Sequence, residues 1–299
     1  MKTKIYLNVA ACTLLLLLST LSSVKAQLNP LSSQYYLNPY LGNPAMAGTD
    51  TTLTVFVTHR KAFMNFPGSP ITQNVSAAYG FKKVGLGINV NVEKAGLQRQ
   101  TRAMGTFSYH LPLNAANDRL HFGLSFGMMT QSLATDEING NPSDILVGEY
   151  NNRETYLDGD FGIAFTHNRF SVEAALPNLK NFFTKDKIKV ADVPTFYSAV
   201  SYKIPLSAES TKYEIELEPK VAYRGIKGFD NIWDGGVQLA FNKRQICLTG
   251  LYHSNQSTTL GLALLVKSKY TISGLYSTQS KALSDHTSGG FEINLGIRL

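Results

Sequence analysis

The chain has 299 residues, with 28 Lys and Arg against 21 Asp and Glu and a formal net charge of +7 at pH 7. Its mean hydropathy of -0.08 suits either a soluble protein or a membrane barrel, and no apolar stretch of about 18 residues after residue 27 could form a transmembrane helix. The basic residues are scattered over turns without stacking aromatics between them, which argues against nucleic acid as a partner.

The first 26 residues have the features of a secretory signal peptide. Lys2 and Lys4 form its positive start, a leucine-rich core follows, and residues 24–26 (VKA) form a small-residue cleavage site. We therefore expect cleavage near Ala26 and export from the cytoplasm. A lipoprotein box at residues 9–12 (VAAC) is disfavoured because it precedes most of the apolar core.

Residues 27–50 differ from the rest of the chain. This segment is rich in Pro, Asn, Gly and Tyr, so it is expected to form neither a regular helix nor a central strand. It also carries more aromatic residues than a typical disordered tail. We expect it to pack on the domain that follows, while a loosely ordered leader is the alternative.

Residues 51–299 alternate apolar and polar side chains in short runs. Leu120, Phe122 and Leu124 would share one face of a strand, because side chains on a strand alternate between its faces. His121 and Ser125 would share the other face. The pattern predicts fourteen strands, at 51–59, 70–81, 84–95, 100–111, 119–131, 156–167, 169–176, 195–204, 213–223, 232–241, 245–252, 258–266, 270–276 and 289–299.

Turn lengths indicate which kind of all-β fold these strands form. Four even-numbered turns are very short, at 82–83, 167–168, 242–244 and 267–269, and the fourth and eighth are slightly longer. The odd-numbered connections are mostly longer, above all the fifth and the seventh. Short periplasmic turns and long outer loops are typical of outer-membrane barrels. We predict an all-β fold, a transmembrane antiparallel up-and-down β-barrel of about 14 strands, with apolar side chains facing lipid and the irregular N-terminal segment before it.

This topology assigns each turn to one side of the outer membrane. Lys82, Lys83, Lys243 and Lys267 should be periplasmic, and Asp136, Asn141 and Lys185 should lie at the cell surface. The basic short turns have two interpretations. They are solvated lysines that protect strand edges, or they contact an acidic partner or anionic lipid headgroups.

The sequence contains no recognisable catalytic or metal-binding pattern. Its six histidines are dispersed without metal-ligand spacing, and no G-x-S-x-G or H-E-x-x-H motif occurs. We expect no enzyme activity, cofactor or metal; His121 and Ser125 should simply line the lumen. After residue 26 only Cys247 remains, which excludes an intramolecular disulfide framework. Inward charges should form an ion-pair network in the lumen; they are Glu214, Glu216, Glu218, Lys220, Asp160 and Glu292.

Residues 33–40 (SQYYLNPY) and 43–48 (NPAMAG) resemble the SQYxxNPxxxNPAxAG motif that opens the PorP/SprF family, whose members are outer-membrane proteins of the type IX secretion system in Bacteroidetes. Weaker matches, such as residues 107–113 and 291–296, extend the resemblance over the whole chain after the signal peptide. The resemblance implies a component that assists secretion or surface anchoring of large proteins, including gliding adhesins, together with other components of the system. A passive porin or channel for small solutes is the alternative.

The N-terminal segment is the candidate functional site, either as a partner-binding element or as a plug at the lumen or the periplasmic mouth. Its candidate residues are Gln34, Tyr35, Tyr36, Asn38, Pro39, Tyr40, Asn43, Pro44 and Gly48. The expected organisation is therefore a signal peptide at 1–26, this segment at 27–50 and an outer-membrane barrel at 51–299.

Overall fold

The computed structural model describes residues 32–65, 67–114, 118–137, 145–151, 155–180, 194–207, 214–226, 231–280 and 287–299. The expected signal peptide, its cleavage site and residues 27–31 lie outside these ranges, as do Asn141 and Lys185. Within the described ranges, no helix is long and apolar enough to cross a membrane.

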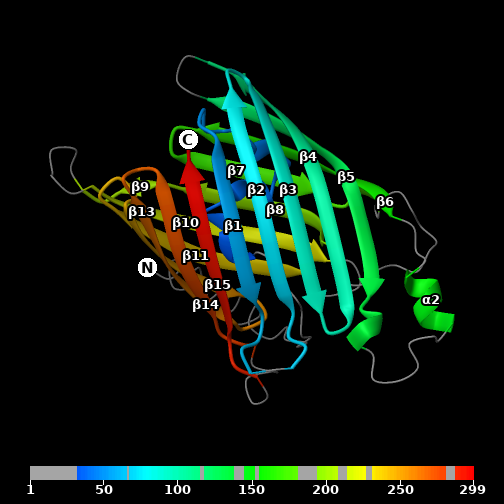
Figure 1. Cartoon of the computed structure of the whole chain (residues 1–299). Coiled ribbons are helices and arrows are strands. Elements are labelled where there is room, and N and C mark those ends of the chain that lie inside the picture. Colours follow the sequence, from blue (N-terminus) through cyan, green and yellow to red (C-terminus); the bar gives the residue numbers. More distant parts are fainter. Residues whose placement is uncertain are drawn as a thin grey trace, which may run out of the picture.

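Antiparallel strands make up most of the described chain after residue 53 (Figure 1). They are β1 (Thr54–Lys61), β2 (Ile71–Phe81), β3 (Val84–Ala95), β4 (Gln98–Pro112), β5 (Arg119–Leu133), β6 (Tyr156–His167), β7 (Phe170–Leu176), β8 (Pro194–Tyr202), β9 (Ile204–Pro205), β10 (Ile215–Ile226), β11 (Ile232–Phe241), β12 (Ile246–His253), β13 (Thr258–Val266), β14 (Tyr270–Ser277) and β15 (Gly290–Arg298). Between β5 and β6 lie η4 (Thr135–Glu137) and the short helix α2 (Ile145–Asn151).

The sheet closes on itself as a barrel. β1 pairs with both β2 and β15, and β10 pairs with both β8 and β11. β8 and β9 both pair with β10 and are separated only by Lys203, so they form one interrupted barrel strand. Counted this way, the fifteen assigned strands make fourteen, and the predicted closed antiparallel barrel is confirmed.

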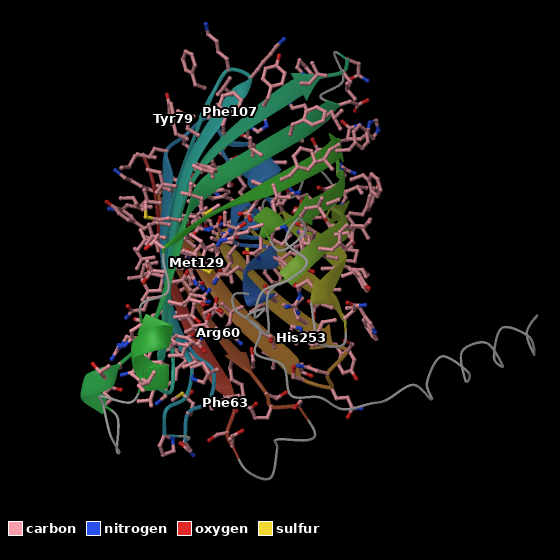
Figure 2. The ribbon with its side chains drawn as sticks, turned by 90° about the vertical axis from the view of Figure 1, so that its right-hand side faces the viewer. Arg60, Phe63, Tyr79, Phe107, Met129 and His253 are labelled. Carbon is pink, nitrogen blue, oxygen red and sulfur yellow. The ribbon has the colours of Figure 1, made fainter. Side chains whose placement is uncertain are left out.

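The apolar face of the strands points outward. On β5, Leu124 is 56% exposed and Phe126 is 61% exposed, whereas Ser125 between them is 3% exposed. Figure 2 shows two further outward aromatic residues, Tyr79 on β2 and Phe107 on β4, on the outside of the sheet. An exposed apolar belt around a polar interior is the arrangement expected for a barrel surrounded by lipid, as the alternation predicts.

The short turns gather at one end of the barrel and α2 lies at the other (Figure 1). The backbones of Leu53 and Leu299 hydrogen-bond at the short-turn end, where Lys82 in the β2–β3 turn adopts a φ of 56°. The length alternation is not strict, because the third connection, at the opposite end, is only residues 96–97. A connection is therefore assigned to one end of the barrel by its place in the antiparallel strand order and not by its length.

Candidate functional site: the N-terminal segment in the lumen

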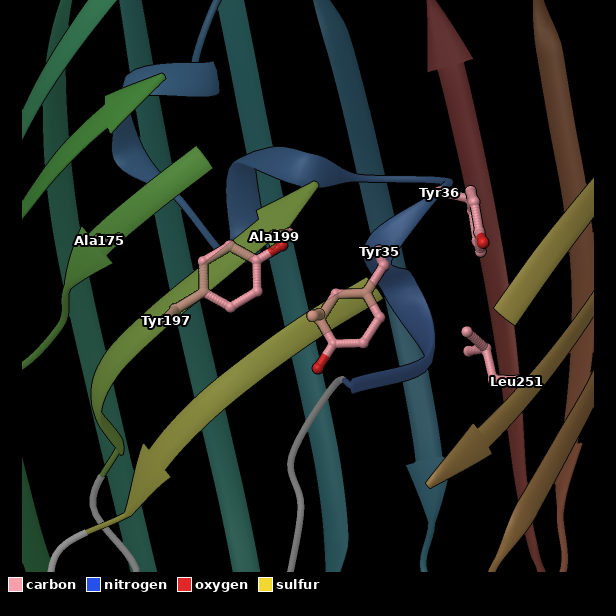
Figure 3. Packing of buried hydrophobic residues seen from close by; sticks show 7 residues of the cluster. Tyr35, Tyr36, Ala175, Tyr197, Ala199 and Leu251 are labelled. Carbon is pink, nitrogen blue, oxygen red and sulfur yellow. The ribbon is translucent and has the colours of Figure 1, made fainter. Parts of the chain in front are cut away.

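Residues 34–48 lie inside the barrel, and we call them the luminal segment (Figures 1 and 3). The chain forms three short 3-10 turns here, η1 (Ser32–Tyr35), η2 (Pro39–Leu41) and η3 (Pro44–Met46). η2 and η3 each begin with a proline, whose fixed φ suits the first position of a helical turn. Asn43 caps η3, because its Oδ1 accepts a hydrogen bond of 3.0 Å from the Ala45 amide. The two Asn-Pro pairs thus produce the irregular path that the sequence predicts.

The beginning of the luminal segment is bonded to β11 and β15. Tyr35 Oη donates a hydrogen bond of 2.6 Å to Asp234 Oδ2 on β11. Gln34 Nε2 donates to the side-chain oxygens of Glu292 and Asn294 on β15. All five side chains are buried, so these are contacts within the molecule rather than at its surface.

The rest of the segment is bonded to β2, β4 and β6, which follow β15 and β1 around the barrel. The contacts are Asn38 Nδ2 to Ser76 Oγ on β2 at 2.8 Å, Tyr40 Oη with Thr106 Oγ1 on β4 at 2.7 Å, and Asn43 Nδ2 to the Ile163 carbonyl on β6 at 3.1 Å. The segment is therefore held by hydrogen bonds, most of them between side chains, to five strands spread around the barrel wall.

Glycines on the inner wall make room for η3. A Cβ built on Gly123 of β5 would overlap backbone atoms of Pro44 and Ala45. A Cβ on the neighbouring Gly162 of β6 would overlap the Asn43 Oδ1. Glycine inside a strand often marks a close approach of another backbone, and here the approaching backbone is the luminal segment.

The end of the segment is fixed near the short turns. Gly48 has a φ of +64°, and a Cβ there would also lie 2.5 Å from the Tyr79 carbonyl oxygen. Gly85 on β3 leaves space for the Ala47 carbonyl, which accepts a hydrogen bond of 2.6 Å from Ser108 Oγ. Gly48 is thus required by both its conformation and its surroundings.

The tyrosines of the segment are buried. Tyr35, Tyr36 and Tyr40 are only 6%, 9% and 7% exposed, and Tyr35 stacks on Tyr197 of β8 with ring centroids 5.9 Å apart (Figure 3). Burial raises the pKa of Tyr35 and Tyr36 well above the usual tyrosine value, and raises that of Tyr40 to about 12. Their hydroxyls therefore stay protonated at physiological pH and can donate hydrogen bonds.

A charged cluster that sequence reasoning missed surrounds Tyr35. Asp234 Oδ2 also accepts hydrogen bonds from Arg224, and Asp234 Oδ1 lies 2.6 Å from His253 Nδ1. His253 Nε2 lies 2.9 Å from Thr259 Oγ1. Although this order resembles an acid–histidine–hydroxyl relay, Thr259 is 1% exposed, so a substrate does not reach it. The cluster instead fixes the Asp234 carboxylate that holds Tyr35.

Two histidines that are separate in sequence meet beside the end of the segment. His110 Nδ1 and His121 Nδ1 lie 2.8 Å apart, and His110 Nε2 lies 3.1 Å from the Ala47 carbonyl. Ser125 lines the lumen as expected, but its Oγ bonds Thr106 at 2.7 Å rather than His121. Within the part of the chain that the structure describes, no three His, Cys, Asp or Glu residues are grouped to hold a metal ion.

Inward charges form ion pairs with one another, and the pairs from β4 to β6 and from β7 to β10 each reach past an intervening strand. The ion pairs are Arg244 with Glu216 at 2.6 Å and Glu218 at 3.4 Å, Lys220 with Glu173 at 3.6 Å, and Arg102 with Asp160 at 2.6 Å and Asp158 at 3.7 Å. Glu292 instead bonds Gln34 of the luminal segment. The prediction was wrong for Glu214, which is exposed because it precedes the first residue of β10.

The chain resembles known proteins in sequence and in fold. A family model described as type IX secretion system membrane protein PorP/SprF matches residues 24–297. Among solved structures, the chain is similar to the Acinetobacter baumannii outer membrane protein Omp33, at 10% identity and a TM-score of 0.50, over 84% of this chain and 100% of that one. The CymD monoaromatic hydrocarbon channel shares 12% identity at a TM-score of 0.43, over 92% and 94% of the two chains. No curated protein matches.

The Omp33 likeness supports the barrel fold alone, because so few residues are identical. The family model is more informative, since its match contains both the luminal segment and nearly all of the barrel. The chain therefore belongs to the PorP/SprF family of type IX secretion system membrane proteins.

Proposed function

We propose that this protein is a non-enzymatic outer-membrane component that assists the secretion or surface anchoring of large proteins, such as gliding adhesins. It would reach the outer membrane after signal-peptide cleavage near Ala26 and work with other components of the type IX secretion system. Family membership and the exposed apolar belt support this proposal.

We further propose that the luminal segment is a plug. One observation carries this assignment: hydrogen bonds tie the segment to five strands spread around the barrel wall, namely β11, β15, β2, β4 and β6. A passive porin depends on a water-filled channel, and a segment bonded across the lumen opposes that.

Of the two roles considered for the luminal segment, plug and partner-binding element, we assign it the first. Tyr35, Tyr36 and Tyr40 face the inside of the barrel and offer little surface to a partner. We therefore assign partner contact to the long fifth and seventh loops, which lie between β5 and β6 and between β7 and β8. A few aromatic or basic anchors there could supply most of the affinity for a secreted polypeptide.

Three measurements test the proposal. Deleting the gene should abolish secretion or surface display of a large partner, and a pull-down from native outer membrane should recover that partner. Purified wild-type protein in a planar bilayer should conduct poorly, whereas Tyr35, Tyr36 and Tyr40 all changed to Ala should raise conductance because the plug loses its anchors. Normal secretion after deletion, together with open-pore conductance of the wild type, would favour the porin alternative.

A further inference from the structure

A cavity of about 410 Å³ remains between the luminal segment and the barrel wall, where β7, β8 and β10 on one part and β1, β2 and β15 on another line it. We call it the short-turn vestibule. Its inner end is lined by Tyr36, Glu173 and Lys220, and its rim at the short-turn end of the barrel carries Arg169 and Lys203. Ligand pockets commonly have volumes of about 300–1,000 Å³, so the vestibule is large enough for a small ligand or a few residues of a polypeptide.

Three polar atoms of residues that line the vestibule have no hydrogen-bond partner in the described protein. Tyr36 Oη, Ser171 Oγ and Glu173 Oε2 are buried and have no hydrogen-bond partner among the described residues. All three residues line the vestibule, and Glu173 is only 2% exposed. Buried polar groups in native proteins are normally bonded to protein, water or a ligand. The inner end therefore has the character of a polar binding site.

The rim presents positive charge. Among the described residues, the side chains of Arg169 and Lys203 form no ion pair or hydrogen bond, although the Lys203 amide donates to the Arg169 carbonyl at 2.9 Å. The two cations thus belong to neighbouring parts of the rim. Arg298 and Asp50, which form an exposed ion pair at 3.7 Å, also line the vestibule. The rim therefore attracts carboxylates.

The basic rim and the polar inner end together favour one class of ligand over another. A simple anion suits the rim, whereas at the inner end the cations Lys220 and Arg244 are already paired with Glu173 and Glu218. A polypeptide with acidic side chains suits both regions, because its backbone N–H groups can donate to Glu173 Oε2 while its carboxylates meet Arg169 and Lys203. The vestibule ends on the luminal segment, so only a short stretch of chain can enter.

We propose that the short-turn vestibule binds an acidic stretch of a partner polypeptide, which enters at the short-turn end of the barrel. This inference rests on the proposed function and specifies the chemistry of one partner. Rim charges should raise the association rate and make it sensitive to salt. Tyr36 Oη and Ser171 Oγ then bond the inserted backbone.

Binding by the full-length protein in detergent micelles tests this proposal. The probe is a fluorescent peptide of alternating Gly and Glu, and the comparison is the same peptide with Gln in place of Glu. We expect saturable binding of the Glu peptide and much weaker binding of the Gln peptide. Changing Arg169 and Lys203 to Ala together should weaken binding about tenfold, as expected from losing two solvent-exposed ion pairs, and should reduce its salt dependence.

Two further variants separate this site from general charge effects and from folding. Lys267→Ala with Lys269→Ala removes the same charge at the same end but outside the vestibule, and should bind like wild type. Tyr36→Phe should weaken binding without lowering barrel stability, because the hydroxyl has no protein partner. Heat-modified gel mobility checks that each variant is folded.

Three results would overturn the proposal. These are the absence of saturable Glu-peptide binding, an equal loss of binding in the Lys267 and Lys269 control, and inorganic phosphate competing as well as unlabelled Glu peptide. The last result would mean a simple anion site. None of them bears on the secretion defect of the deletion strain, so the proposed function can stand if the vestibule binds nothing.

Discussion

Replacing Gly123 with Ala should loosen the luminal segment from the barrel wall. The new Cβ would overlap backbone atoms of Pro44 and Ala45, and a backbone cannot swing aside as the end of a flexible side chain can. Overpacking a filled interior costs about 1–3 kcal/mol. Because β5 is fixed by pairing with β4 and β6, we expect the segment to yield, with docking weakened by about 2 kcal/mol.

This weakening is measurable by hydrogen exchange. A loss of about 2 kcal/mol corresponds to roughly a thirtyfold larger undocked population. Exchange of the peptide that covers the luminal segment should therefore accelerate by about that factor, while peptides from the strands stay protected. Gly162→Ala should act similarly through Asn43. Since either Cβ displaces the same turn, the double variant should cost less than the sum of the two single variants.

A glycine on the outer surface provides the matched control. Gly105 on β4 is exposed, and a Cβ there would find its nearest atom, the Phe126 carbonyl oxygen, 3.9 Å away. Gly105→Ala should leave exchange of the segment unchanged. If Gly123→Ala showed wild-type protection of the segment, the inferred contact between η3 and β5 would be refuted.

Three other outcomes are expected. Leu124→Arg should destabilise the barrel by about 2–4 kcal/mol in a bilayer refolding titration, because Leu124 faces outward, whereas a near-neutral result would mean that it does not contact lipid. Tags inserted after Asn141 and after Lys243 should be labelled on intact cells only at Asn141; the opposite labelling would invert the topology. The raised pKa of Tyr40 contributes stability that is complete below the usual pKa near 10 and lost as pH rises through about 12, so near-ultraviolet circular dichroism should show an alkaline transition that Tyr40→Phe lacks.

The strands could be predicted from the sequence because polar and apolar side chains alternate along them with a period of two residues. Leu124 and Ser125 differ in polarity, and a period of two residues assigns them to opposite faces without knowledge of the neighbouring strands. The same local information cannot detect the interruption at Lys203, which shows only in how β8 and β9 pair with β10. It also cannot fix pairing register, which determines the partners of each inward residue.

The candidate site was predicted less completely for the same reason. The composition of residues 27–50 indicated that the segment packs on the domain, and Tyr35 was among the candidates. Its partner Asp234 was not, because the meeting of Asp234 and His253 depends on the register between β11 and β12. Gly123 and Gly162 are visible in the sequence as glycines within the polar faces of β5 and β6. Their presence alone does not identify the segment that approaches them.

The contacts of Gln34 have a consequence for the order of folding. Gln34 bonds Glu292 and Asn294, so the first described turn of the chain depends on β15, which forms from nearly the last residues. Contacts so distant in sequence form slowly, because a long loop must close before they contribute. We therefore expect barrel closure through β1 and β15 to precede docking of the luminal segment, so a chain that stalls before closure keeps Tyr35, Tyr36 and Tyr40 accessible to periplasmic chaperones.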